Sequence, residues 1–76
     1  MIRDRLRRLA ALNTYQVMYP ITAADVVEHV AAEYVNEGDS ERVGDVCFWT
    51  VDLPSEVAAA LVKALADVDH ACVKML

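Results

Sequence analysis

The apolar residues of this chain are mostly small, and this limits the core that it can build. Of its 43 hydrophobic residues, 12 are alanine and 12 are valine. The chain has 76 residues, half of the roughly 150 of an average domain, so it can form one domain with one core. A hydrophobic fraction of 57% excludes intrinsic disorder. We therefore expect a single globular domain over residues 1–76 that buries its apolar groups densely.

Charge is distributed unevenly along the chain. The first eight residues hold one acid and four arginines: Arg3, Arg5, Arg7 and Arg8. Residues 9–76 hold eleven acids against three bases, a formal charge of −8. Because such a body repels phosphate, it disfavours non-specific nucleic-acid binding, and only the N-terminal arginines could contact a nucleic-acid backbone.

The sequence contains no segment that we expect to enter a membrane or to direct export. The longest uncharged run covers residues 9–24, is interrupted by Pro20, and is too short to span a bilayer. Polar residues interrupt the stretch that a signal peptide would need to be apolar. We expect a cytoplasmic protein with no membrane association, in which Cys47 and Cys72 are free thiols.

Hydrophobic periodicity predicts helices at 2–12, 22–36 and 53–67. Thr22 is a suitable N-cap for the second helix, and Gly38 supplies a left-handed stop after it. Pro54 suits the first turn of the third helix.

Short strands are expected at 17–20, 45–51 and 70–75. The β-branched and aromatic run over 45–51 favours a strand, although its apolar residues also share one helical arc. The predicted fold is therefore a small, helix-dominated α+β domain. The alternative, with a helix over 40–52, is an all-α domain of four helices.

The predicted order of elements is compatible with a winged-helix-like topology. The stretch YPITAADVVEHV resembles the strand and second helix of winged helix-turn-helix proteins, and SEVAAALVKALADVDHACVKML resembles their third helix and wing. Together the two stretches cover about half of the chain. The connection over 37–52 is longer than the turn of that motif, and Lys63 is the single base of the helix that would read DNA.

We find no constellation of residues that predicts catalysis, a metal site or a cofactor site. Only His70 and Cys72 approach the close spacing of zinc ligands. Cys47 lies in an apolar run that should raise its pKa and bury it. A glycine-rich phosphate loop is excluded because the chain has two glycines, Gly38 and Gly44. We therefore expect a protein that is not an enzyme.

The acidic stretch 33–45 and the adjacent tryptophan are the best candidates for a partner-binding surface. The candidate residues are Glu33, Glu37, Asp39, Glu41, Asp45 and Trp49. Acidic side chains suit docking on a basic, nucleic-acid-handling protein, and an exposed tryptophan would anchor the contact. The sequence thus predicts a small regulator that acts by protein–protein binding, by analogy with inhibitors encoded by phages or mobile elements.

Two further hypotheses follow from other parts of the chain. A DNA-binding transcriptional regulator with a winged-helix-like fold would use Arg3, Arg5, Arg7 and Arg8 to contact phosphate. A homodimer could form through Ala59, Ala60 and Ala66, because small side chains on the third predicted helix allow close approach of two backbones.

Overall fold

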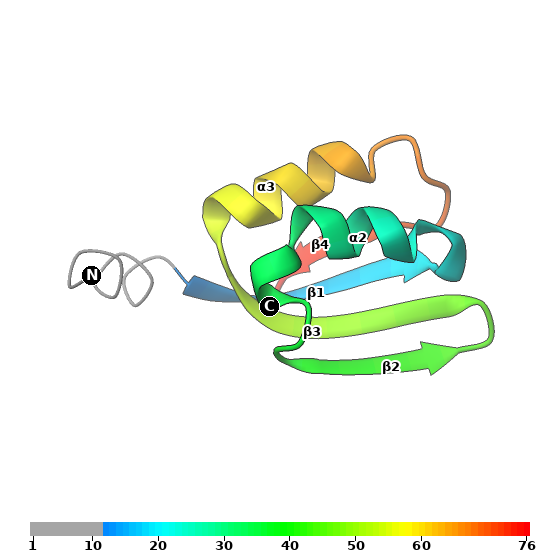
Figure 1. Ribbon diagram of the computed structural model, residues 1–76, viewed down its shortest axis with the longest axis horizontal. Helices are drawn as coiled ribbons and strands as arrows, with labels where there is room; N and C mark the ends of the chain where they lie inside the picture. The colour runs from blue at the N-terminus through cyan, green and yellow to red at the C-terminus, as the bar shows by residue number, and fades with distance from the viewer. Residues whose placement is uncertain (1–11) are drawn as a thin grey trace.

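Four strands form one antiparallel sheet in residues 12–76, which are the residues that this computed structural model describes (Figure 1). The elements, in chain order, are β1 (Leu12–Pro20), the 3₁₀ turn η1 (Ile21–Ala23), α2 (Ala24–Val30), the 3₁₀ turn η2 (Ala32–Tyr34), β2 (Asp39–Val43), β3 (Val46–Pro54), α3 (Ser55–Ala64) and β4 (Cys72–Met75). The strand order across the sheet is β2-β3-β1-β4. A β-α-β-β-α-β chain of this kind is the split β-α-β, or ferredoxin-like, arrangement.

The two central strands make the longest pairing in the sheet. β1 and β3 pair over nine residues each, from Leu12 opposite Pro54 to Pro20 opposite Val46. The short strands β2 and β4 form the edges. Both α2 and α3 lie on the same side of the sheet (Figure 1).

A two-residue turn joins β2 to β3. Val43 pairs with Val46, so Gly44 and Asp45 are the two turn residues. Gly44 has a φ of +62°, which glycine adopts without the steric cost that other residues meet. A glycine at the first turn position followed by another residue is typical of a type II′ hairpin.

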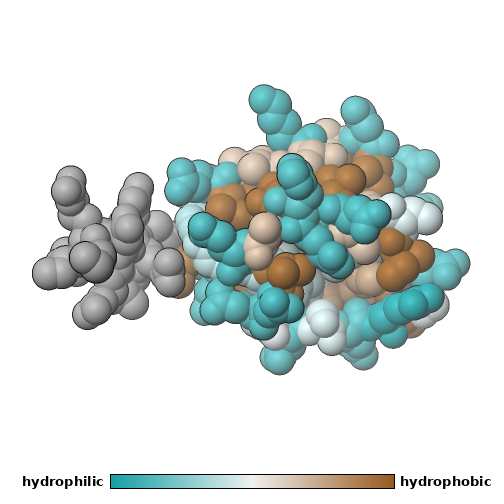
Figure 2. All heavy atoms as spheres, viewed as in Figure 1, coloured by the Kyte–Doolittle hydropathy of each residue, from teal (hydrophilic) through white to brown (hydrophobic). Residues whose placement is uncertain are grey.

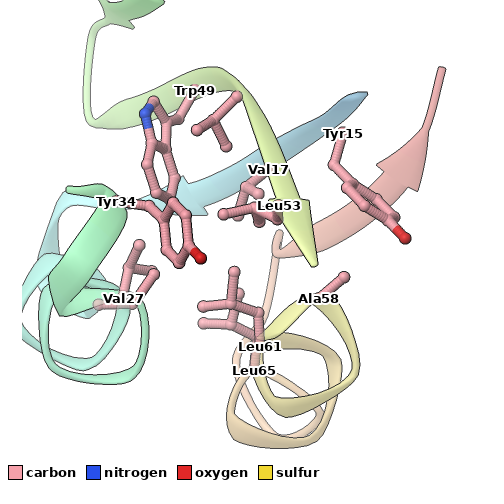
Figure 3. Packing of buried hydrophobic residues seen from close by; sticks show 12 residues of the cluster. Tyr15, Val17, Val27, Tyr34, Trp49, Leu53, Ala58, Leu61 and Leu65 are labelled. Atoms are coloured by element: carbon pink, nitrogen blue, oxygen red, sulfur yellow. The ribbon is translucent and has the colours of Figure 1, made fainter. Parts of the chain in front are cut away.

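The core lies between the sheet and the two helices (Figure 3). Its largest fully buried side chains are Leu53, Leu61, Val17 and Val27. Burial of each contributes roughly 1.5–3 kcal/mol. Trp49 and Tyr34 lie close together at one side of this core (Figure 3), so two aromatic rings supplement the small side chains.

The prediction of a helix-dominated fold with three helices is wrong. The residues that the structure describes contain two α-helices and a four-stranded sheet, which also excludes the all-α alternative with four helices. The winged-helix-like topology is likewise not the observed one, because both predicted strands 17–20 and 45–51 belong to long central strands of a single sheet. The predicted helix 2–12 lies outside the described residues, apart from Leu12, which begins β1.

Both predicted helices within the described residues are longer than the helices observed. In place of 22–36, α2 covers only Ala24–Val30. Thr22 was predicted to cap this helix, but it lies within η1, and Ala23 is the N-cap residue of α2. Three of the seven α2 residues are valines, which are weak helix formers, and Ala31 leaves helical geometry with ψ of +38°. In place of 53–67, α3 covers Ser55–Ala64, because Leu53 and Pro54 complete β3.

The two central strands are longer than predicted. The strand expected at 17–20 is the end of β1, and the one expected at 45–51 extends to Pro54 in β3. Pro20 was expected to confine its strand to a sheet edge, yet β1 is central. It is tolerated there because it is the last residue of the strand, where a missing backbone donor interrupts no further pairing. The strand expected at 70–75 is β4, Cys72–Met75.

Candidate functional site

Neither α2 nor α3 covers the second face of the sheet (Figure 1). Val17 and Trp49 are buried beneath the helix layer and pair with each other. Because side chains alternate between the two faces of a strand, the neighbours of these residues point the other way. We call the resulting set the open face: Thr14, Gln16 and Met18 of β1, Asp39, Glu41 and Val43 of β2, Val46, Phe48, Thr50 and Asp52 of β3, and Cys72 and Lys74 of β4.

Apolar side chains occupy the middle and one end of the open face. Phe48 pairs with Met18 on β1 and with Glu41 on β2, and both apolar side chains are half-buried. Val43 and Val46 pair with each other at the hairpin end, where Val43 is 59% exposed. A half-buried aromatic side chain with aliphatic neighbours on a rigid sheet is the kind of surface that anchors protein–protein contacts.

Acidic side chains lie along one edge and at one end of the open face. Asp39 and Glu41 lie on β2, and Asp52 lies on β3, where the Thr14 hydroxyl donates a hydrogen bond to its carboxylate. Lys74 is the one basic residue of the open face as defined above. Residues 12–76 hold eleven acids against three bases, so their net charge is negative. The open face is negative as well.

A cleft opens at one end of the open face, where β2 stops and β3 continues. It has a volume of about 310 Å³ and is lined by Leu12, Thr14, Tyr34, Glu37, Gly38, Thr50, Val51 and Asp52. We call it the β3-edge cleft. Two carboxylates and three hydroxyl-bearing side chains line it, together with apolar walls from Leu12 and Val51.

The loop that forms one wall of this cleft is held in place by two features. The indole Nε1 of Trp49 donates a hydrogen bond of 2.7 Å to the backbone carbonyl of Glu37. Gly38 has a φ of +76° and lies so close to β3 that an added Cβ would be 2.9 Å from the Cα of Val51. The loop therefore requires glycine at this position, both for its conformation and for its closeness to the strand.

The structure brings together only part of the predicted acidic surface. Glu37, Asp39 and Glu41 follow one another along the loop and β2. Asp45 lies at the opposite end of β2, in the hairpin turn, where its carbonyl accepts the N–H of Ile21 at 2.7 Å. Glu33 is exposed in η2, which follows α2, so it is separate from the open face.

Trp49 is part of the core and not of the surface. It is 3% exposed, and its one polar atom is satisfied by the Glu37 carbonyl. Its neighbour Phe48 points to the open face instead. Sequence reasoning missed Phe48 and Met18 as residues of the open face. Strand alternation places Phe48 and Trp49 on opposite faces of the sheet, but it does not tell which face the helices cover.

The residues of the remaining two hypotheses are only partly described. Arg3, Arg5, Arg7 and Arg8 lie outside the described residues. Ala59 and Ala60 are exposed on α3, whereas Ala66 lies beyond the end of that helix. Figure 2 shows apolar and polar side chains interspersed on the face of the molecule that it views.

The groups of the described residues that could carry chemistry are acids, histidines, thiols and phenols. Within residues 12–76, no group of three or more histidine, cysteine or acidic side chains is arranged to hold a metal ion. Cys47 and Cys72 are free and belong to opposite faces of the sheet. Burial raises the pKa of the Tyr19 phenol above its ordinary 10.0, and nearby Cys47 and Glu28 raise it further. A phenol with a raised pKa stays protonated at neutral pH, so little phenolate is available there to act as a base.

The helices α2 and α3 are short, with 7 and 10 residues. No helix in residues 12–76 is both long and apolar enough to cross a bilayer. No family model matches the chain, and no characterised protein or solved structure matches it either.

Proposed function

We propose that this protein is a small, non-enzymatic regulator that binds another protein through its open face. The proposal depends on one observation about the open face. Its middle holds the apolar side chains of Phe48 and Met18, and the acids Asp39, Glu41 and Asp52 lie on the same face. Apolar side chains supply the contact area of an interface, and surrounding charges select the partner and speed its approach.

The charge of the open face indicates the chemistry of the partner. An acidic rim attracts a basic surface and repels phosphate, so a protein with a basic, nucleic-acid-handling groove is favoured over nucleic acid itself. By analogy, such a role is that of the inhibitors encoded by phages and mobile elements. Two free thiols suit a reducing compartment, and we place the protein in the cytoplasm.

Affinity capture from the source cell with matched charge variants tests this proposal. Glu41→Lys reverses a charge in the middle of β2 on the open face, whereas Asp67→Lys makes the same change at an exposed position after α3. We expect the wild type and Asp67→Lys to retain one basic protein that Glu41→Lys loses. Exposed charges contribute only ~0–1 kcal/mol to stability, so both variants should remain folded.

A different outcome would assign binding to another part of the chain. If partner binding survives Glu41→Lys and is lost when the four arginines Arg3, Arg5, Arg7 and Arg8 become alanine, the open face is not the binding surface. Salt-dependent binding of the chain to DNA that Glu41→Lys strengthens would favour the nucleic-acid hypothesis instead.

A further inference from the structure

The β3-edge cleft combines its negative charge with backbone groups that have no strand partner. The β2–β3 pairing runs from Val43 opposite Val46 to Asp39 opposite Thr50, and β3 then continues to Pro54. Along an antiparallel pair, hydrogen-bonded residues alternate with non-bonded ones. The two-residue turn makes Val46 the first bonded residue of β3, so Phe48 and Thr50 are the next.

Asp52 continues this series beyond the end of β2. Its N–H and C=O point to the side of β3 that β2 has left, which is the side of the cleft. No backbone bond joins these two groups to the loop within residues 12–76. A donor and an acceptor at strand spacing on an open edge are the groups that an added extended peptide uses.

The side chains around this edge favour a ligand that carries a positive charge. Glu37 and Asp52 are both exposed and line the cleft, and no basic residue among residues 12–76 lines it. Thr14 and Thr50 add hydroxyl groups, and Leu12 and Val51 supply apolar walls for the stem of a long side chain. A volume of about 310 Å³ is at the lower limit of ligand sites, so it suits one or two side chains better than a cofactor.

We propose that the β3-edge cleft binds a short extended segment of the partner that carries an arginine or lysine. The backbone of this segment pairs with Asp52 in continuation of β2, and its cationic side chain lies beside the carboxylates of Glu37 and Asp52. This inference rests on the proposed function, because it names the part of the basic partner that the open face recognises.

A blocked peptide, acetyl-Val-Arg-Val-Arg-Val-amide, tests the inference directly. Titration into the full ¹⁵N-labelled chain should shift the amide signals of Gly38, Thr50 and Asp52. Asp52→Asn or Glu37→Gln should weaken binding about tenfold, the loss expected for a hydrogen bond to a charged group. Asp67→Asn, which removes the same charge from an exposed position outside the cleft, should leave the affinity unchanged.

Two altered peptides separate the two parts of the proposal. Citrulline in place of arginine keeps the shape and removes the charge, and N-methylation of the two arginine residues removes the backbone donors that would face Asp52. Both changes should abolish the shifts. Equal binding of either altered peptide, an equal loss of affinity in Asp67→Asn, or no shift at these amides at about millimolar peptide would overturn the inference.

The chain's own arginines are the rival occupant. If replacing Arg3, Arg5, Arg7 and Arg8 by alanine in the full chain itself shifts the amides of Gly38 and Asp52, and raises peptide affinity, the cleft serves this chain and not a partner. Failure of the cleft proposal can be distinguished from failure of the proposed function. A captured partner that Glu41→Lys loses and Asp52→Asn retains would sustain the open face and overturn the cleft.

Discussion

Replacing Gly38 by alanine should destabilise the protein more than the same change at Gly44. Both glycines have positive φ, +76° and +62°, which costs an L-residue about 1–2 kcal/mol. At Gly44 a new Cβ meets nothing within 4 Å, so this conformational cost is the whole effect. At Gly38 the Cβ meets the backbone carbonyl of Thr50 and lies 2.9 Å from the Cα of Val51.

Backbone atoms of a central strand cannot move aside, so the loop at Gly38 must shift. This shift weakens the 2.7 Å bond from the Trp49 indole to the Glu37 carbonyl, and a buried donor left without a partner costs ~1–3 kcal/mol. We expect a loss of about 2–5 kcal/mol for Gly38→Ala against about 1–2 kcal/mol for Gly44→Ala. In a domain of this size each kilocalorie lowers Tm by roughly 4–8 °C.

Urea and thermal unfolding, followed by the fluorescence of the single tryptophan, measure both variants. Trp49 reports on the loop directly, because its indole bonds to the residue next to Gly38. Equal destabilisation by the two substitutions would refute the close approach of the loop to β3, and with it the wall of the β3-edge cleft.

Three other predictions concern the core, the effect of pH and the thiols. Leu61→Ala should cost ~2–5 kcal/mol in urea unfolding because the side chain is fully buried, whereas Val62→Ala, at a position 54% exposed, should cost less than about 0.5 kcal/mol. The pKa of Tyr19 is raised above 10.0, first by burial, so its contribution to stability is complete below about pH 10 and is lost as the pH rises through the folded-state pKa. The fall in unfolding free energy between about pH 8 and pH 11 should therefore be smaller in Tyr19→Phe, and an identical fall would contradict this assignment. Exposed Cys72 should react with a thiol reagent faster than half-buried Cys47, which comparison of the two single Cys→Ser variants measures; equal rates would contradict their placement.

The sequence supported the α+β class and the strand over 45–51, but it underestimated the sheet. β1 was recognised only at its end because Asn13 and Thr14, polar and exposed, hide the alternation at its start. What makes this segment a strand is pairing with residues 26 to 42 positions away, from Pro20–Val46 to Leu12–Pro54. Propensity within a short window does not contain that information.

Helix length was overestimated for a related reason. Apolar residues at helical spacing continue past Val30, but Ala31 and Tyr34 reach the core from a 3₁₀ turn instead of from further helix. One signal was available and not used: Gly44 followed by Asp45, between β-branched residues, is a two-residue hairpin turn, and it identifies β2 as a strand.

The candidate site was predicted in its charge and not in its geometry. Asp39 and Glu41 were named from sequence and lie on the open face, whereas the aromatic residue of that face is Phe48 in place of Trp49. Two adjacent aromatic residues on a strand point to opposite faces, and only the position of the helices decides which one is buried. That position depends on the whole fold.

The direct test of the central claim is the map of the surface that a captured partner covers. We propose to titrate the ¹⁵N-labelled chain with that partner and to record which amide signals shift or broaden. The account predicts that the affected residues cluster on the open face, around Met18, Glu41, Phe48 and Thr50, while Ala59 and Val62 on α3 stay unchanged. A map centred on α2 and α3, with the open face unaffected, would contradict it.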